Sequence, residues 1–154
     1  MTAPLAIAHR GDPRRHTENT LASFDSAVRA GADMVELDLR CTRDGAIVVL
    51  HDQTLNRLWG DHRAVADLDL AEVQSLGPNR STDQRIPTLA ELLAAVPLPL
   101  MVDFTGEEVV AGALEAVRHA NAIDRSLFVS GNVPALRALR ALAHHFISWA
   151  KSRH

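Results

Sequence analysis

Short apolar runs alternate with amphipathic stretches along this 154-residue chain. Apolar or alternating runs predict strands over residues 4–8, 33–39, 46–50, 98–104 and 126–130. Helical spacing predicts helices that begin at Leu21 and that cover 68–76, 88–96, 107–120 and 134–144. Such alternation is typical of an α/β fold with a mainly parallel sheet. Because no linker or internal repeat divides the chain, we expect one domain over residues 1–154.

Composition excludes several classes of function. The formal net charge is −3 and no run of basic residues is present, which argues against nucleic-acid binding. No stretch approaches the 18 apolar residues or so of a membrane span, and the first residues lack a signal-peptide pattern. We therefore expect a cytoplasmic protein without membrane insertion. The single cysteine, Cys41, excludes an internal disulfide and a cysteine-rich zinc site.

Charged residues follow the predicted strands where parallel sheets assemble their sites. His9 ends the first strand, and the C-terminal strand ends are the usual place for chemistry in such folds. Glu36 and Asp38 alternate with apolar residues, so both carboxylates leave one face of their strand. The two carboxylates form either the solvent-exposed polar face of an edge strand or a buried pair that needs a counter-charge. A divalent cation that prefers oxygen ligands, Ca²⁺ or Mg²⁺, would supply that charge.

The dipeptide Asp44-Gly45 indicates a hairpin between the second and third strands. If these two residues form the centre of the turn, Asp38 lies directly opposite His51, and the two side chains share a face. A parallel crossover would instead bring His51 to a strand end near His9. Both geometries place two histidines beside two carboxylates.

Three further residues are candidates for the same site. Asp103, near the end of the strand over 98–104, is either a turn former or a third oxygen ligand of the cation. Arg10 is either a surface ion-pair partner or a bidentate contact for phosphate. Glu18 either turns into the site as a substrate-binding residue or is an acidic residue of a first helical turn. Together with the histidines, this set predicts metal-assisted phosphoester chemistry.

Several motifs of the chain resemble, in order and spacing, those of the glycerophosphodiester phosphodiesterase family. The resemblance covers residues 5 to 140 and is closest up to residue 104. The motifs are IAHRG at 7–11, ENT at 18–20, GADMVELD at 31–38, TRDG at 42–45, VVLHD at 48–52, LNR at 55–57 and IPTLAELL at 86–93.

This resemblance implies a TIM-type (β/α) barrel that hydrolyses small glycerophosphodiesters to glycerol 3-phosphate and an alcohol. It implies that His9 and His51 are the acid and the base, that Arg10 contacts phosphate, and that one divalent cation is held by Glu36 and Asp38. Two positions depart from the family pattern. Asp103 stands where the family usually has a Glu ligand, and Thr105 stands where it usually has a Lys.

The length of the chain implies an incomplete barrel. A complete barrel of this kind has about 250 residues, whereas this sequence predicts about five of the eight strands, and residues 144–154 resemble none of the family's motifs. We expect the first strand and the strand over 126–130 to be open edges that expose Leu5, Ile7, Leu127 and Val129. Self-association or a partner would cover these edges. The alternative to an enzyme is an inactive homologue that binds phosphate or a partner.

Overall fold

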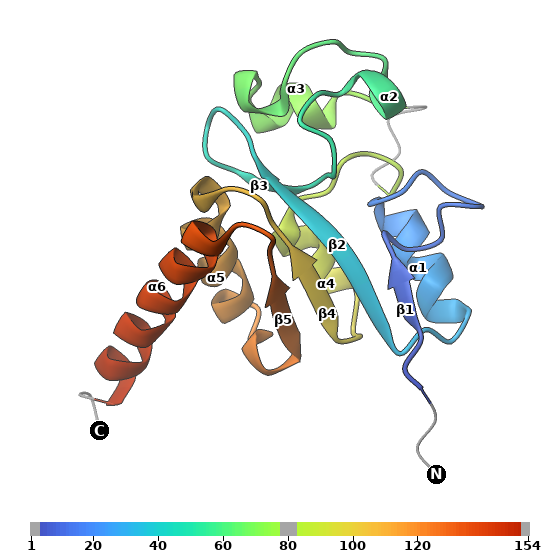
Figure 1. The fold of residues 1–154 in the computed structure, drawn as a ribbon. Helices are drawn as coiled ribbons and strands as arrows, with labels where there is room; N and C mark the ends of the chain where they lie inside the picture. Colours follow the sequence, from blue (N-terminus) through green and yellow to red (C-terminus); the bar gives the residue numbers. More distant parts are fainter. Residues whose placement is uncertain (1–3, 78–82, 152–154) are drawn as a thin grey trace.

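The computed structural model describes residues 4–77 and 83–151 and contains the expected α/β sheet (Figure 1). Four strands run parallel in the order β1-β2-β4-β5, and β3 lies off this path, antiparallel to β2. The bounds of the strands are β1 Ile7–His9, β2 Met34–Cys41, β3 Ile47–Val49, β4 Leu100–Asp103 and β5 Ser126–Val129.

Helices connect the parallel strands and cover one face of the sheet. In Figure 1, α1, α4 and α5 lie behind the strands and α6 lies beside α5. Their bounds are α1 Leu21–Arg29, α2 Asn56–Trp59, α3 Leu70–Gln74, α4 Leu89–Ala95, α5 Val110–His119 and α6 Val133–Lys151. The sequence did not predict the short α2, and α6 continues beyond the predicted end at residue 144. No helix in the described part of the chain is long and apolar enough to cross a membrane.

The two faces of the sheet differ in chemistry because alternate residues of each strand point to opposite sides. Val35, Leu37 and Val102 are fully buried against the helices. The opposite face, which we call the open face, carries Glu36 and Asp38. In the parallel register, His9 on β1 lies beside Glu36, Asp103 on β4 lies beside Asp38, and Val129 on β5 lies beside Asp103. The prediction that the carboxylates and the apolar residues of β2 separate onto two faces is therefore confirmed.

The β2–β3 hairpin forms, but its predicted register is wrong by one residue. Leu39 pairs with Val49, and the backbone carbonyl of Asp38 accepts a hydrogen bond from the Leu50 amide at 3.0 Å, so Asp38 does not lie opposite His51. The reason is the turn, which has three loop residues over 43–45 instead of two central ones. Gly45 adopts a φ of +84° and adds the extra residue. The antiparallel pairing also excludes the parallel crossover.

Both outer strands of the sheet expose apolar side chains, as expected. Leu5 and Ile7 at β1 are 70% and 43% exposed, and Leu127 on β5 is 51% exposed. Val129 differs from the expectation because it is only half-buried, next to Asp103 in the parallel register. Within the described residues, neither β1 nor β5 has a strand on its outer side.

Candidate active site

The three predicted metal ligands come together on the open face. Glu36 and Asp38 follow one another on that face of β2, and Asp103 is the parallel partner of Asp38 on β4. One carboxylate oxygen of each residue lies within 4.8 Å of the other two. The parallel register of two neighbouring strands therefore builds a compact cluster of oxygen donors.

The electrostatics of this cluster favour a bound cation. Glu36 and Asp38 are each 8% exposed. Burial and the neighbouring charge of Asp38 raise the pKa of Glu36 to about 7. The same two causes raise the pKa of Asp103. A closely spaced set of donors that contains only carboxylate oxygens fits a hard divalent cation such as Ca²⁺ or Mg²⁺.

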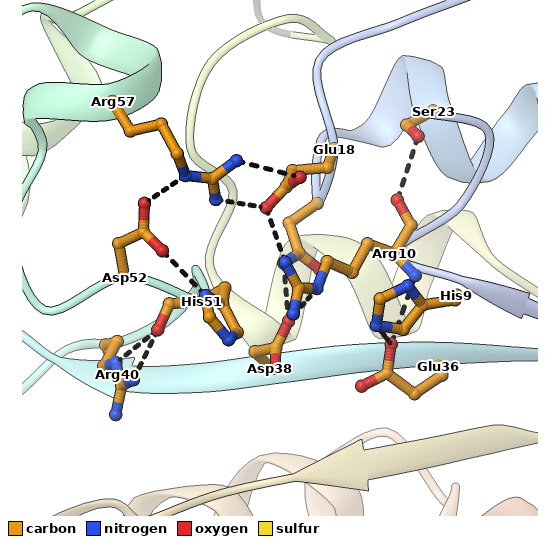
Figure 2. Close-up of polar contacts among 11 residues, drawn as sticks. His9, Arg10, Glu18, Ser23, Glu36, Asp38, Arg40, His51, Asp52 and Arg57 are labelled. Carbon is orange, nitrogen blue, oxygen red and sulfur yellow. Dashed lines mark hydrogen bonds and ion pairs between the residues drawn. The ribbon is translucent and has the colours of Figure 1, made fainter. Parts of the chain in front are cut away.

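Arg10 reaches into this cluster rather than lying on the surface. Its Nε is 3.0 Å from Oδ2 of Asp38, and its Nη1 donates to Oε1 of Glu18 at 3.0 Å. Its backbone amide also donates to Oε2 of Glu36 at 3.2 Å. Arg10 therefore ties the loop after β1 to both carboxylates of β2, as Figure 2 shows.

The loop after β1 owes its shape to residues with left-handed backbone conformations. Arg10 has a φ of +57° and Gly11 a φ of +86°. A Cβ on Gly11 would lie 2.6 Å from the carbonyl carbon of Ser23, so a glycine is needed there. The Ser23 hydroxyl donates to the Arg10 carbonyl at 3.0 Å and accepts from the Asp12 amide at 2.8 Å. These contacts fasten Arg10 to the first turn of α1.

Asn19 is a site residue that the sequence analysis missed. It is buried, with 2% exposure, and its Nδ2 donates to Oδ2 of Asp38 at 2.9 Å. Its φ of +59° is a conformation that asparagine tolerates better than most residues. Asn19 directly precedes Thr20, the N-cap of α1. An asparagine just before a helix cap was the available signal.

The two histidines lie on either side of the carboxylate cluster and are accessible. Nε2 of His9 is 3.8 Å from Oε2 of Glu36, and the His9 side chain is 68% exposed. The His51 side chain is 43% exposed. His51 also lines a small cavity of about 60 Å³ together with Asp38 and Asp103. His51 therefore lies beside Asp38, as predicted, although the register of the hairpin that brings it there differs from the predicted one.

Asp52 and Arg57 support His51 from behind. Nδ1 of His51 lies 2.7 Å from Oδ1 of Asp52, and Oδ2 of Asp52 accepts from Nε of Arg57 at 2.6 Å. The Arg57 hydrogen bond, followed by that of His51, holds the pKa of Asp52 at about 2. A carboxylate at Nδ1 favours the tautomer that carries its proton there and leaves Nε2 free as an acceptor. The His51-Asp52 dipeptide was the signal that could have identified this support.

Glu18 connects the two halves of the site. Its Oε1 accepts from Nη1 of Arg10 at 3.0 Å and from Nη2 of Arg57 at 2.6 Å. Burial alone would raise the pKa of Glu18, but the hydrogen bonds from these two guanidinium groups outweigh it and lower the pKa. A chain of alternating charge therefore runs from Asp38 through Arg10, Glu18 and Arg57 to Asp52 (Figure 2). We call this the charge chain.

The fold and the site define a (β/α)-barrel type of protein whose polar site lies at the C-terminal ends of parallel strands. The model of the glycerophosphoryl diester phosphodiesterase family matches residues 9–146, and the chain belongs to this family.

Named relatives and solved structures agree with this assignment. The chain is 32% identical over 154 aligned residues to a glycerophosphodiester phosphodiesterase of Caldanaerobacter subterraneus. This alignment covers 92% of this chain and 63% of that protein. It superposes with a TM-score of 0.82 and 31% identity on a phosphodiesterase of Oleispira antarctica in complex with the product sn-glycerol-3-phosphate, covering 90% of this chain and 62% of that one.

A third similarity is to a glycerophosphodiester phosphodiesterase of Thermotoga maritima, with a TM-score of 0.77 and 31% identity over 88% of this chain and 58% of that one. The expected fold class, an incomplete TIM-type barrel, is thereby confirmed. The chain spans somewhat less than two thirds of the length of these relatives.

The support of His51 predicts a pH-dependent contribution to stability. Because the pKa of Asp52 is about 2 in the folded protein, below the ordinary value near 4, the ionised form favours folding. This contribution is fully present above pH about 4 and is lost as the pH falls towards 2. We expect the difference in unfolding free energy between the wild type and Asp52→Asn, from urea denaturation, to shrink over that range. A difference that does not vary with pH would contradict this assignment.

Proposed function

We propose that this chain hydrolyses glycerophosphodiesters to glycerol 3-phosphate and an alcohol with the aid of one divalent cation. The observation that carries the proposal is the cluster of Glu36, Asp38 and Asp103 within 4.8 Å, flanked by two accessible histidines. The names of the relatives and the product bound to the Oleispira antarctica protein support the substrate class.

The side chains divide the chemistry among them. One imidazole of the pair His9 and His51 accepts a proton from the attacking hydroxyl, and the other protonates the leaving oxygen. Arg10 stabilises negative charge on the phosphoryl oxygens, and Glu18 holds Arg10 in place. Glu36, Asp38 and Asp103 would hold the cation, which would supply a Lewis acid for those oxygens. The substrate is a small molecule, and a cytoplasmic location remains a prediction from the sequence.

The acid and base assignment predicts a large loss of activity in single variants. Replacing His9 or His51 by alanine should lower kcat for glycerophosphocholine by about two to four orders of magnitude, which is the usual size of general acid or base catalysis. His119→Ala is the matched control because His119 is 80% exposed on α5, where it pairs with Glu115. Wild-type turnover in His51→Ala would disprove the assignment.

The cation assignment is tested by binding. We expect Ca²⁺ or Mg²⁺ to bind the wild type, and turnover to stop when a chelator is added, because all proposed ligand atoms are carboxylate oxygens. The double variant Glu36→Gln, Asp38→Asn should lose cation binding in calorimetry. The control Asp25→Asn, Glu115→Gln removes the same charge from two exposed ion pairs and should bind as the wild type does. Unchanged binding in the first variant would refute the assignment.

We also propose that the open edges of this chain associate with a second copy. Exposed Ile7 lies on β1 and exposed Leu127 on β5, and a hollow of about 640 Å³ lined by Ile7, Ala8 and Ala27 lies beside β1. Since both outer strands point the same way, β5 of one copy can pair in parallel with β1 of another.

Self-association makes the thermal stability of the purified chain depend on its concentration. We expect the Tm to rise with protein concentration and sedimentation to show species larger than a monomer. A strict monomer that melts cooperatively above about 60 °C, independently of concentration, would overturn the proposal, since that is the upper range for ordinary domains.

A further inference from the structure

Arg40 brings a third arginine to the candidate site, and neither the sequence analysis nor the charge chain includes it. On β2, Arg40 follows Glu36 and Asp38 at a spacing of two residues, so all three side chains leave the open face. Arg40 is half-buried and lines the same small cavity as His51 and Asp103. A guanidinium group therefore lies beside the oxygen cluster at the end of the strand.

The partners of Arg40 are neutral, unlike those of the other two arginines of the site. Its Nε donates to the backbone carbonyl of His51 at 2.9 Å, its Nη2 donates to the same oxygen, and its Nη1 donates to Oγ1 of Thr105. Arg10 and Arg57 each pair with two carboxylates. Within the described part of the chain, no carboxylate lies within ion-pair distance of Arg40. Its positive charge is therefore not compensated by a direct contact.

The hydrogen bonds of Arg40 also leave donors available. A guanidinium group has five N–H donors, and the three contacts to His51 and Thr105 use one on each of its nitrogens. One N–H on each Nη nitrogen is left without a partner among the described residues. Two such donors suit two oxygens of one phosphate.

We propose that Arg40 is a substrate-binding residue that contacts the phosphoryl group of the diester and of its product. Asp38 and Asp103 belong both to the oxygen cluster and to the lining of this cavity, so an anion bound to a cation held there would lie beside Arg40. Thr105 orients the guanidinium group of Arg40. On this side of the site, the positively charged side chain that faces the phosphate therefore comes from β2. The inference rests on the proposed function and deepens it by adding a second phosphate contact to Arg10.

The variant Arg40→Gln tests the contact. In the full chain with Ca²⁺ or Mg²⁺ present, calorimetry should show an affinity for glycerol 3-phosphate about tenfold to a hundredfold lower than in the wild type, the usual worth of hydrogen bonds to a charged group. KM for glycerophosphocholine should rise, and the affinity for the cation should not fall. Arg43→Gln is the matched control because Arg43 lies three residues further along the hairpin, is exposed, and pairs with Asp69 and Glu72. It should bind glycerol 3-phosphate as the wild type does.

A second variant separates two effects of Arg40, which are phosphate binding and the hydrogen bonds to the backbone carbonyl of His51. Adding Thr105→Lys to Arg40→Gln places an ammonium group next to the former position of Nη1 without restoring the bonds to the His51 carbonyl. Partial recovery of the affinity for glycerol 3-phosphate supports the proposal. A lower kcat in Arg40→Gln with wild-type affinity for glycerol 3-phosphate overturns it, because Arg40 would then only position His51.

The two proposals can fail separately. A wild type that binds the cation and glycerol 3-phosphate through Arg40 but turns over no diester contradicts the proposed function and supports the phosphate contact. A wild type that turns over the diester, with unchanged glycerol 3-phosphate binding in Arg40→Gln, contradicts the contact alone.

Discussion

The rest of the site depends on the pairing of β2 with a parallel strand on each side. This pairing sets His9 beside Glu36 and Asp38 beside Asp103 in register, while Val35 and Leu37 anchor the other face in the core. Like charges held this close repel one another, and burial adds to the cost of ionising them. Arg10 and Asn19 offset part of that cost through Oδ2 of Asp38. The negative charge that remains uncompensated favours the binding of a cation in the cluster.

The charge chain holds the loop after β1 and the segment after β3 in one arrangement. Arg10 and Glu18 belong to the loop after β1, whereas Asp52 follows β3 and Arg57 lies on α2. Because Glu18 accepts from both arginines, each loop limits the movement of the other. A site held in this way is organised before any ligand binds, so less ordering has to occur on binding.

The sequence was sufficient for the features that depend on periodicity. The alternation over 33–39 correctly separated the charged from the apolar face of β2, and the helix predicted over 88–96 is α4, which begins with a capping box of Thr88 and Glu91. It was insufficient where one residue changes the geometry. The left-handed Gly45 lengthened the turn and shifted the hairpin register. The contacts of Arg40 and Arg57 depend on how loops and strand ends meet in space, which no local pattern encodes.

The positions of the site residues along the chain determine when the site can arise during synthesis. All the side chains discussed for the site lie between His9 and Thr105 of the 154-residue chain, and the charge chain closes within residues 10–57. During synthesis, which runs from the N-terminus, every one of these residues has therefore been made before the segments that become β5 and α6 exist. The last third of this chain then adds a flank to a polar centre whose components are already complete.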